Sequence, residues 1–307
     1  MSSLNTNIAA MTALQTLNQT NKELLGTQRR ISTGLRVGDA SDNAAYWSIA
    51  TTMRSDNMAI STVQDALGLG AATAEVTVTA MNSAIETVQK ILAKLVAARA
   101  PGLDRSKIQS EIDVLQTELR SKAESAVFSG ENWLVGDSTG TTQKSIVSAF
   151  SRDSTGAISI GTIAVDVGPT GTMLFDTSGS NQGILDFERS ISTGNYSVST
   201  LDIGSLTDSP TDLQDLEDMI DGVDAALKLM TDAATVLGAA KSRISLQKDF
   251  VSKLMQSIDT GIGQLVDAEM NEESTRLQAL QVRQQLGVQA LGIANQSAQQ
   301  ILALFQN

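Results

Sequence analysis

The clearest apolar pattern in the chain lies at residues 211–258, which read TDLQDLEDMIDGVDAALKLMTDAATVLGAAKSRISLQKDFVSKLMQSI. Apolar side chains recur there at alternating steps of three and four, the heptad spacing that places them along one seam of a helix. Only Lys241 and Lys248 break the series. A continuous helix over this stretch would extend about 70 Å, so it needs partners along its length. The seam consists of Leu213, Leu216, Ile220, Val223, Leu227, Met230, Ala234, Leu237, Ile244, Val251, Met255 and Ile258.

Two further segments offer such partners. The first of them has the same heptad spacing as residues 211–258, with Thr77 as its one polar position, and ends at Pro101-Gly102. The second is expected to form a shorter helix that begins near Asp104 as its N-cap and runs to about Ala126. Together the three segments predict an elongated helical bundle. The seam of the first of these segments is Ile60, Val63, Leu67, Gly70, Ala74, Met81, Ala84, Val88, Ile91, Leu95 and Ala98.

The two chain ends carry thinner seams. Asn21, Gln28 and Gln284 fall on them, and Gly26 and Gly34 weaken the first helix. A lone helix of this kind is marginal in water, so we expect both ends to be disordered in a monomer. Their charges are complementary, because residues 1–36 have a net charge of about +3 and residues 266–307 about −2 at neutral pH. We therefore expect the two ends to pair.

The period changes between residues 137 and 209. Residues 144–151 and 157–167 alternate β-branched with small or polar residues, and 152–156 resemble a hairpin loop. This segment predicts a small β-rich insertion. The acidic run 208–224 is expected to be a solvated helix face, since it lacks the spacing of a calcium-binding loop. The overall expected fold is mainly α, with long antiparallel coiled-coil helices formed by the N- and C-terminal segments.

Composition excludes much chemistry. The chain has no His and no Cys, which removes the Ser-His-Asp triad, thiolate nucleophiles and ordinary zinc sites. Carboxylate pairs such as Glu272-Glu273 are expected on exposed faces, where nothing would separate their pKa values. A net charge of −12 argues against nucleic-acid binding. We therefore predict a protein that is not an enzyme and has no cofactor or metal ion. We also expect neither a cleaved secretory signal nor a membrane-spanning segment.

Both ends of the chain carry long sequence motifs. The N-terminal motifs are SLNTN at 3–7, QRRISTGLR at 28–36, ASDNAA at 40–45 and IA at 49–50. The C-terminal motifs are RLQALQV at 276–282, QQLGVQAL at 284–291, IANQ at 293–296 and ILALF at 301–305. With these motifs the chain resembles bacterial flagellin, in particular the alphaproteobacterial type over residues 42–56, and the resemblance covers about the first 135 and the last 95 residues. It rests most directly on Ser32, Gly34, Asp42, Asn43, Ala44, Ala45, Gln285, Gly287 and Asn295.

The resemblance implies a secreted subunit that polymerises head to tail into the extracellular flagellar filament used for swimming. It also implies three parts: an inner-core coiled coil of residues 1–43 and 266–307, a helical rod of 44–136 and 210–265, and a variable outer domain of 137–209. Expected partners are further flagellin subunits, including other isoforms, a secretion chaperone, the filament cap and the hook-filament junction proteins, but neither nucleic acid nor a membrane. Self-assembly is expected to involve Leu14, Leu17, Leu24, Ile31, Leu35, Arg36, Leu277, Leu280, Leu286, Leu291, Ala294, Ile301 and Phe305.

Two other functions share part of this pattern. A hook-filament junction protein would have the same terminal pairing, although the uninterrupted C-terminal motif favours flagellin. A secreted membrane-active translocator would need a broad apolar helix face with basic flanks, whereas these seams are narrow and the chain is acidic.

Overall fold

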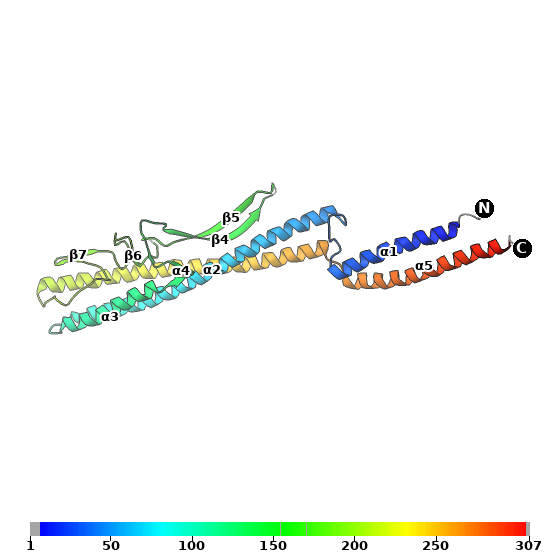
Figure 1. Cartoon of the computed structure of the whole chain (residues 1–307). Helices are drawn as coiled ribbons and strands as arrows, with labels where there is room; N and C mark the ends of the chain where they lie inside the picture. The colour runs from blue at the N-terminus through cyan, green and yellow to red at the C-terminus, as the bar shows by residue number, and fades with distance from the viewer. Residues whose placement is uncertain (1–6, 154, 170, 305–307) are drawn as a thin grey trace. The chain divides into compact units, whose positions relative to one another are not determined.

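The computed structural model describes residues 7–153, 155–169 and 171–304, with side chains up to residue 297. Long helices form most of this part of the chain and short strands lie between α3 and α4 (Figure 1). This confirms the mainly α class with a small β-rich insertion. The helices are α1 (Ile8–Thr33), α2 (Ala44–Ala98), α3 (Arg105–Glu124), α4 (Pro210–Val266) and α5 (Met270–Leu304). The strands are β1 (Val127–Phe128), β2 (Glu131–Asn132), β3 (Val135–Gly136), β4 (Gln143–Arg152), β5 (Ile158–Asp166), β6 (Phe175–Asp176), β7 (Arg189–Ile191) and β8 (Gly194–Tyr196).

The chain divides into two compact units. One unit contains Met1–Asn57 with Gln256–Asn307, and the other contains Met58–Met255. The three-part division expected from the resemblance stays a prediction.

Within the unit 58–255, α2 and α4 run antiparallel. Lys241 of α4 pairs with Glu75 of α2, and Glu217 pairs with Arg99, so partner numbers fall in one helix as they rise in the other. Every predicted seam position of α2 is buried, including Thr77. The heptad pattern of residues 60–98 therefore gave the correct core face.

The core face of α4 is wider than predicted. Positions 216, 223, 230, 237, 244 and 251 are buried as expected, whereas 220, 227 and 234 are only half-buried. Met219, Ala226 and Ala233 are buried in their place. The physical reason is that α4 packs against the insertion as well as against α2, so a second row of side chains loses its contact with water.

Arg105 organises the turn between α2 and α3. Asp104 is the N-cap of α3 as predicted, although its side chain makes no capping hydrogen bond. The buried Arg105 guanidinium instead donates to the Ala98 carbonyl at 3.1 Å, the Leu206 carbonyl at 3.2 Å and the Asp208 carboxylate at 2.7 Å. These bonds satisfy a free carbonyl at the end of α2 and fix the segment that leads into α4.

The insertion begins with the predicted hairpin. β4 and β5 pair antiparallel from Gln143↔Asp166 to Arg152↔Ile158, with a bulge between Val147 and Ala149. The Asp153 carboxylate closes the turn by accepting from the amides of Thr155 and Ala157. The hairpin is therefore confirmed.

Polar groups of α4 hold the last strands of the insertion. The Asp215 carboxylate accepts from the amides of Ser192 at 2.9 Å and Thr193 at 3.1 Å, and the Tyr196 hydroxyl donates to the Asp218 carbonyl at 2.7 Å. Asp215 is fully buried. The expectation that residues 208–224 form a solvated face is therefore wrong at Asp215, because its carboxylate replaces water as the partner of two loop amides.

The Gly222→Ala substitution should destabilise this contact. A Cβ at Gly222 would lie 2.0 Å from the Tyr196 hydroxyl oxygen, so the rigid ring must move and lose its bond to Asp218. We expect a loss of about 1–3 kcal/mol in the free energy of unfolding, typical of an overfilled core, measured by urea unfolding followed by circular dichroism. Gly238→Ala in the same helix meets no atom within 4 Å and should instead add up to about 1 kcal/mol. Equal effects of both substitutions would contradict this packing.

Asp176 fixes a turn beside β3 and β6. Its buried carboxylate accepts from the amide and hydroxyl of both Ser138 and Ser178 and from the Gln182 amide. Burial alone would raise the pKa of Asp176, but these hydrogen bonds outweigh burial and lower the pKa far below its usual range. The ionised carboxylate therefore stabilises the turn at neutral pH.

The stabilisation by Asp176 should depend on pH. A carboxyl whose pKa is lower in the folded state contributes fully above the unfolded pKa of about 4 and loses this contribution as the pH falls. We expect Asp176→Asn to be less stable than the parent protein at neutral pH, with a difference that shrinks between about pH 5 and pH 2. Urea unfolding across this range measures it. Asp249→Asn, at an exposed position of α4, is the control, and parallel pH curves for both variants would refute the role of Asp176.

Candidate functional site

In the unit that contains both chain ends, α1 and α5 lie side by side and antiparallel (Figure 1). The Asn7 side-chain amide donates to the Ala294 carbonyl at 2.9 Å, the Gln284 amide donates to Asn21 at 2.8 Å, and Arg30 pairs with Glu273 at 3.1 Å. The predicted pairing of the two ends is therefore confirmed. Asn21 and Gln284, which break the apolar seams in the sequence, satisfy each other across the helix pair.

Capping groups define α1. The Asn7 side chain accepts from the Ala10 amide at the start of the helix. Gly34 ends it with φ of 71°, a left-handed conformation that glycine adopts without strain, and its amide donates to the Arg30 carbonyl. The motif glycine therefore has a local reason: it stops the helix and lets the chain turn.

The contact face of the pair includes most of the predicted apolar positions. Leu280 is buried, at 4% exposure, and Gly287 lies against Leu17, where a Cβ would be 3.2 Å from Leu17 Cδ1. A larger residue at 287 would push the helices apart. The half-buried predicted residues are Leu17, Leu24, Ile31, Leu277, Leu291 and Ala294.

The predicted seam of the N-terminal helix is wrong at Leu14. This residue is 48% exposed, and Gln28 is exposed as well, whereas Ala13, Thr20 and Thr27 face the partner helix. Ala13 and Leu14 lie four and three positions before Leu17, and residues at both distances share a helix face with it. The apolar spacing alone therefore does not decide which of the two faces the partner helix. The smaller side chains lie inside because they let the two helices approach closely.

Apolar side chains also lie on the outer faces of the pair. Leu286 is 58% exposed and Ile293 is 68% exposed. A shallow hollow of about 740 Å³ between the helices is lined by small residues, including Ala9, Ala290 and Ser297. The pair therefore presents apolar surface that its own two helices do not cover. The exposed apolar residues are Ile8, Met11, Leu14, Leu25, Val282, Leu286, Val288 and Ile293.

A second hollow, of about 570 Å³, is basic. We call it the basic groove and define it by Lys22, Arg30, Arg276 and Arg283, which line it together with Glu23 and apolar or small side chains. Glu273 lies beside it, is only 5% exposed, and accepts from Arg30 and Arg276 at 3.1 and 3.3 Å. The expectation that the Glu272-Glu273 pair is exposed is therefore wrong for Glu273, because α1 covers it.

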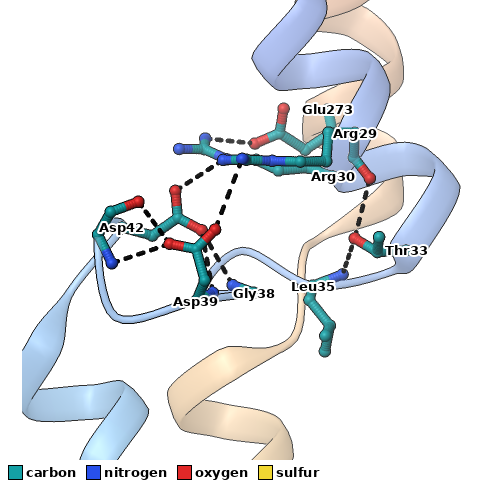
Figure 2. A network of polar contacts seen from close by, with 9 residues as sticks. Arg29, Arg30, Thr33, Leu35, Gly38, Asp39, Asp42 and Glu273 are labelled. Carbon is teal, nitrogen blue, oxygen red and sulfur yellow. Dashed lines mark hydrogen bonds and ion pairs between the residues drawn. The ribbon is translucent and has the colours of Figure 1, made fainter.

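Figure 2 shows the polar network of the turn after α1. Asp42 accepts from the amides of Gly38 and Asp39 and from the Arg29 guanidinium at 2.8 Å. Hydrogen bonds from Ser41, followed by the nearby Arg29 charge, lower the pKa of the Asp39 carboxyl. Arg29 therefore pairs with both carboxylates and stabilises the turn.

The remaining motif residues shape the exit into α2. The Asn43 side chain accepts from the Tyr46 amide and caps α2. Arg36 donates to the carbonyls of Gln264 and Leu265 near the end of α4, and Leu35 packs beside Val37 on a small apolar cluster. Much of the N-terminal motif thus builds a turn. Exposed motif residues are Ser32, Ala44, Ala45, Gln285 and Asn295.

Some predicted residues lie outside this description. The backbone of Ile301 is in α5, but its side chain is not among those described, and Phe305 and residues 3–6 lie outside the described residues altogether. Within the described ranges, none of the helices has the length and apolar character needed to cross a membrane. Those ranges also hold no cluster of metal-ligating acidic side chains.

Comparison with known proteins identifies the family. The bacterial flagellin N-terminal helical region matches residues 4–139, and the bacterial flagellin C-terminal helical region matches residues 220–305. Similar relatives include Flagellin C of Rhizobium meliloti (strain 1021), 48% identical, and Flagellin A of the same strain, 43% identical. The Brucella melitensis flagellin is 44% identical, and each alignment covers all of both chains.

These similarities extend over the whole chain and do not favour a junction protein or a membrane-active translocator. The chain therefore belongs to the bacterial flagellin family, of the alphaproteobacterial type, and is a structural subunit of the flagellar filament rather than an enzyme.

Proposed function

We propose that the paired terminal helices α1 and α5 are the part of this flagellin that joins subunits in the inner core of the filament. The observation that carries this proposal is the apolar surface left open on the outer faces of both helices. Single exposed apolar residues are normal on a protein surface. Their recurrence along both members of one pair is typical of an interaction surface.

Covering these side chains would favour assembly strongly. Full burial of one Val, Leu, Ile or Met side chain contributes about 1.5–3 kcal/mol. A narrow two-helix contact offers little burial of its own, so the helices gain most of their stability when neighbouring subunits pack on them. Head-to-tail contacts whose rotation does not close produce an open helical polymer.

In this proposal the predicted assembly residues have different roles. Leu17, Leu24, Ile31, Leu277, Leu280, Leu291 and Ala294 face the partner helix within one subunit, whereas Leu14 and Leu286 face neighbouring subunits. Leu35 and Arg36 support the turn beneath the pair. Ile301 and Phe305 extend the C-terminal seam by sequence pattern alone.

The cellular setting is proposed from the family. The subunit would leave the cell unfolded through the flagellar type III pathway, bound first by a secretion chaperone, and would meet the filament cap and the hook-filament junction proteins outside. The absence of cysteine is compatible with this route. Rhizobium meliloti has relatives named Flagellin A, B, C and D, which supports assembly with other isoforms. Residues 137–209 would then face the surrounding medium.

Polymerisation tests the proposal. We expect Leu286→Gln with Ile293→Gln to raise the critical concentration for filament growth at least about tenfold, since each tenfold step equals about 1.4 kcal/mol. Sedimentation and electron microscopy of protein seeded with filament fragments measure it. Gln289→Ala, at an exposed position of the same helix, should leave growth unchanged, and a chain lacking residues 266–307 should not grow at all. Normal growth of the double variant would refute the role of this face.

The free subunit should have poorly ordered ends. In dilute monomer we expect the amides of α1 and α5 to exchange with solvent much faster than those of α2 near Leu67 and Leu95, because few apolar contacts hold them. In filaments the same amides should become protected. Hydrogen–deuterium exchange with mass spectrometry compares both states, and α2 provides the internal control. Strong protection of both ends in the monomer would contradict coupling between their folding and assembly.

A further inference from the structure

We propose that the basic groove binds the carboxylates of Asp267 and Glu269 of a second copy of this chain. The inference rests on the proposed function, because it assigns one specific contact to the joining of subunits. The contact is between charged side chains and does not involve the exposed apolar faces of the helix pair.

The groove has positive charge that its own subunit does not neutralise. The Lys22 side chain is exposed and makes no ion pair within the described residues. Arg283 reaches Glu23 only at 3.9 Å, and its side chain is 63% exposed. Over the ranges of α1 and α5 there are five basic against three acidic side chains, in a chain whose net charge is −12. The helix pair is thus a positive surface on a negative protein.

The proposed ligand lies at the start of α5. Asp267 and Glu269 are exposed, and neither forms an ion pair with the described part of the chain. They belong to the same compact unit as the groove. These two carboxylates therefore lack a cation partner within the described residues, as Lys22 lacks a carboxylate partner.

Asp267 and Glu269 should not reach Lys22 and Arg283 within one subunit. Glu269 lines one hollow with Arg276, but it precedes α5, and Arg283 lies fourteen residues further along. At 1.5 Å per residue a rigid helix holds Glu269 and Arg283 about 20 Å apart along its axis, and Lys22 is level with Arg283, since its neighbour Glu23 pairs with Arg283.

A second copy removes this geometric obstacle. The groove and the carboxylates are different surfaces of the same unit, so a contact between them is heterologous and can repeat from copy to copy. Opposite charges at such a contact give orientation and speed to assembly, and wrong registers bring like charges together. The contact therefore fits the head-to-tail joining of identical subunits better than the binding of a nucleic acid, which the acidic chain would repel.

Charge exchange tests the inference. We expect Lys22→Glu with Arg283→Glu to raise the critical concentration for seeded growth at least tenfold, and Asp267→Lys with Glu269→Lys to do the same. For the chain that carries all four substitutions, the critical concentration should return to within about threefold of that of the parent protein, because the charges on both sides of the contact are reversed. The loss in each double variant should diminish at about 1 M NaCl, where charges are screened within about 3 Å.

Controls separate this contact from other effects. Circular dichroism of each variant checks that α2 and α4 remain folded. Lys107→Glu with Lys248→Glu makes the same charge change at exposed positions outside the helix pair and should not alter growth. An equal effect of this control, normal growth of either double variant, or failure of the fourfold variant to recover would overturn the inference while the parent protein still forms filaments. If the parent protein itself formed no filaments, the proposed function would fall as well.

Discussion

A long helix with one apolar stripe cannot bury that stripe alone, and the rest of this structure depends on how the stripe is covered. In the unit 58–255 the predicted seam of α2 and the main row of α4 are covered. The heptad rows of α2 and α4 face each other antiparallel, and Leu67, Met81 and Leu237 are fully buried. Burial of such side chains contributes about 1.5–3 kcal/mol each, which stabilises helices far longer than those of most globular domains.

The same constraint is only half met at the chain ends. Between α1 and α5 the contact consists of small and medium side chains, and polar bonds such as that between Asn21 and Gln284 supply register rather than apolar burial. Leu14, Leu286 and Ile293 remain in water. The helix pair at the chain ends thus keeps apolar surface that further copies of the chain can cover.

Buried charge contributes specificity in several places. Arg105 joins the end of α2 to the start of the α4 segment, Asp215 ties the last strands of the insertion to α4, and Glu273 joins α5 to Arg30 of α1. Leaving any of these groups unpaired in the interior would cost several kcal/mol. Each therefore selects one arrangement of elements that apolar packing alone would leave open.

Local spacing in the sequence predicted the long helices and the core row of α2. Alternation and turn residues predicted the hairpin after Gln143, and complementary charge predicted the pairing of the ends. The terminal motifs identified the family by their resemblance to known flagellins. Which of two adjacent rows faces inward was settled by the fold: Thr20 rather than Leu14 in α1, and Met219 as well as Leu216 in α4. The burial of Asp215 and Glu273, and the basic groove, likewise arise where segments far apart in the chain meet. No local pattern contains that information, since it depends on which surfaces lose their contact with water.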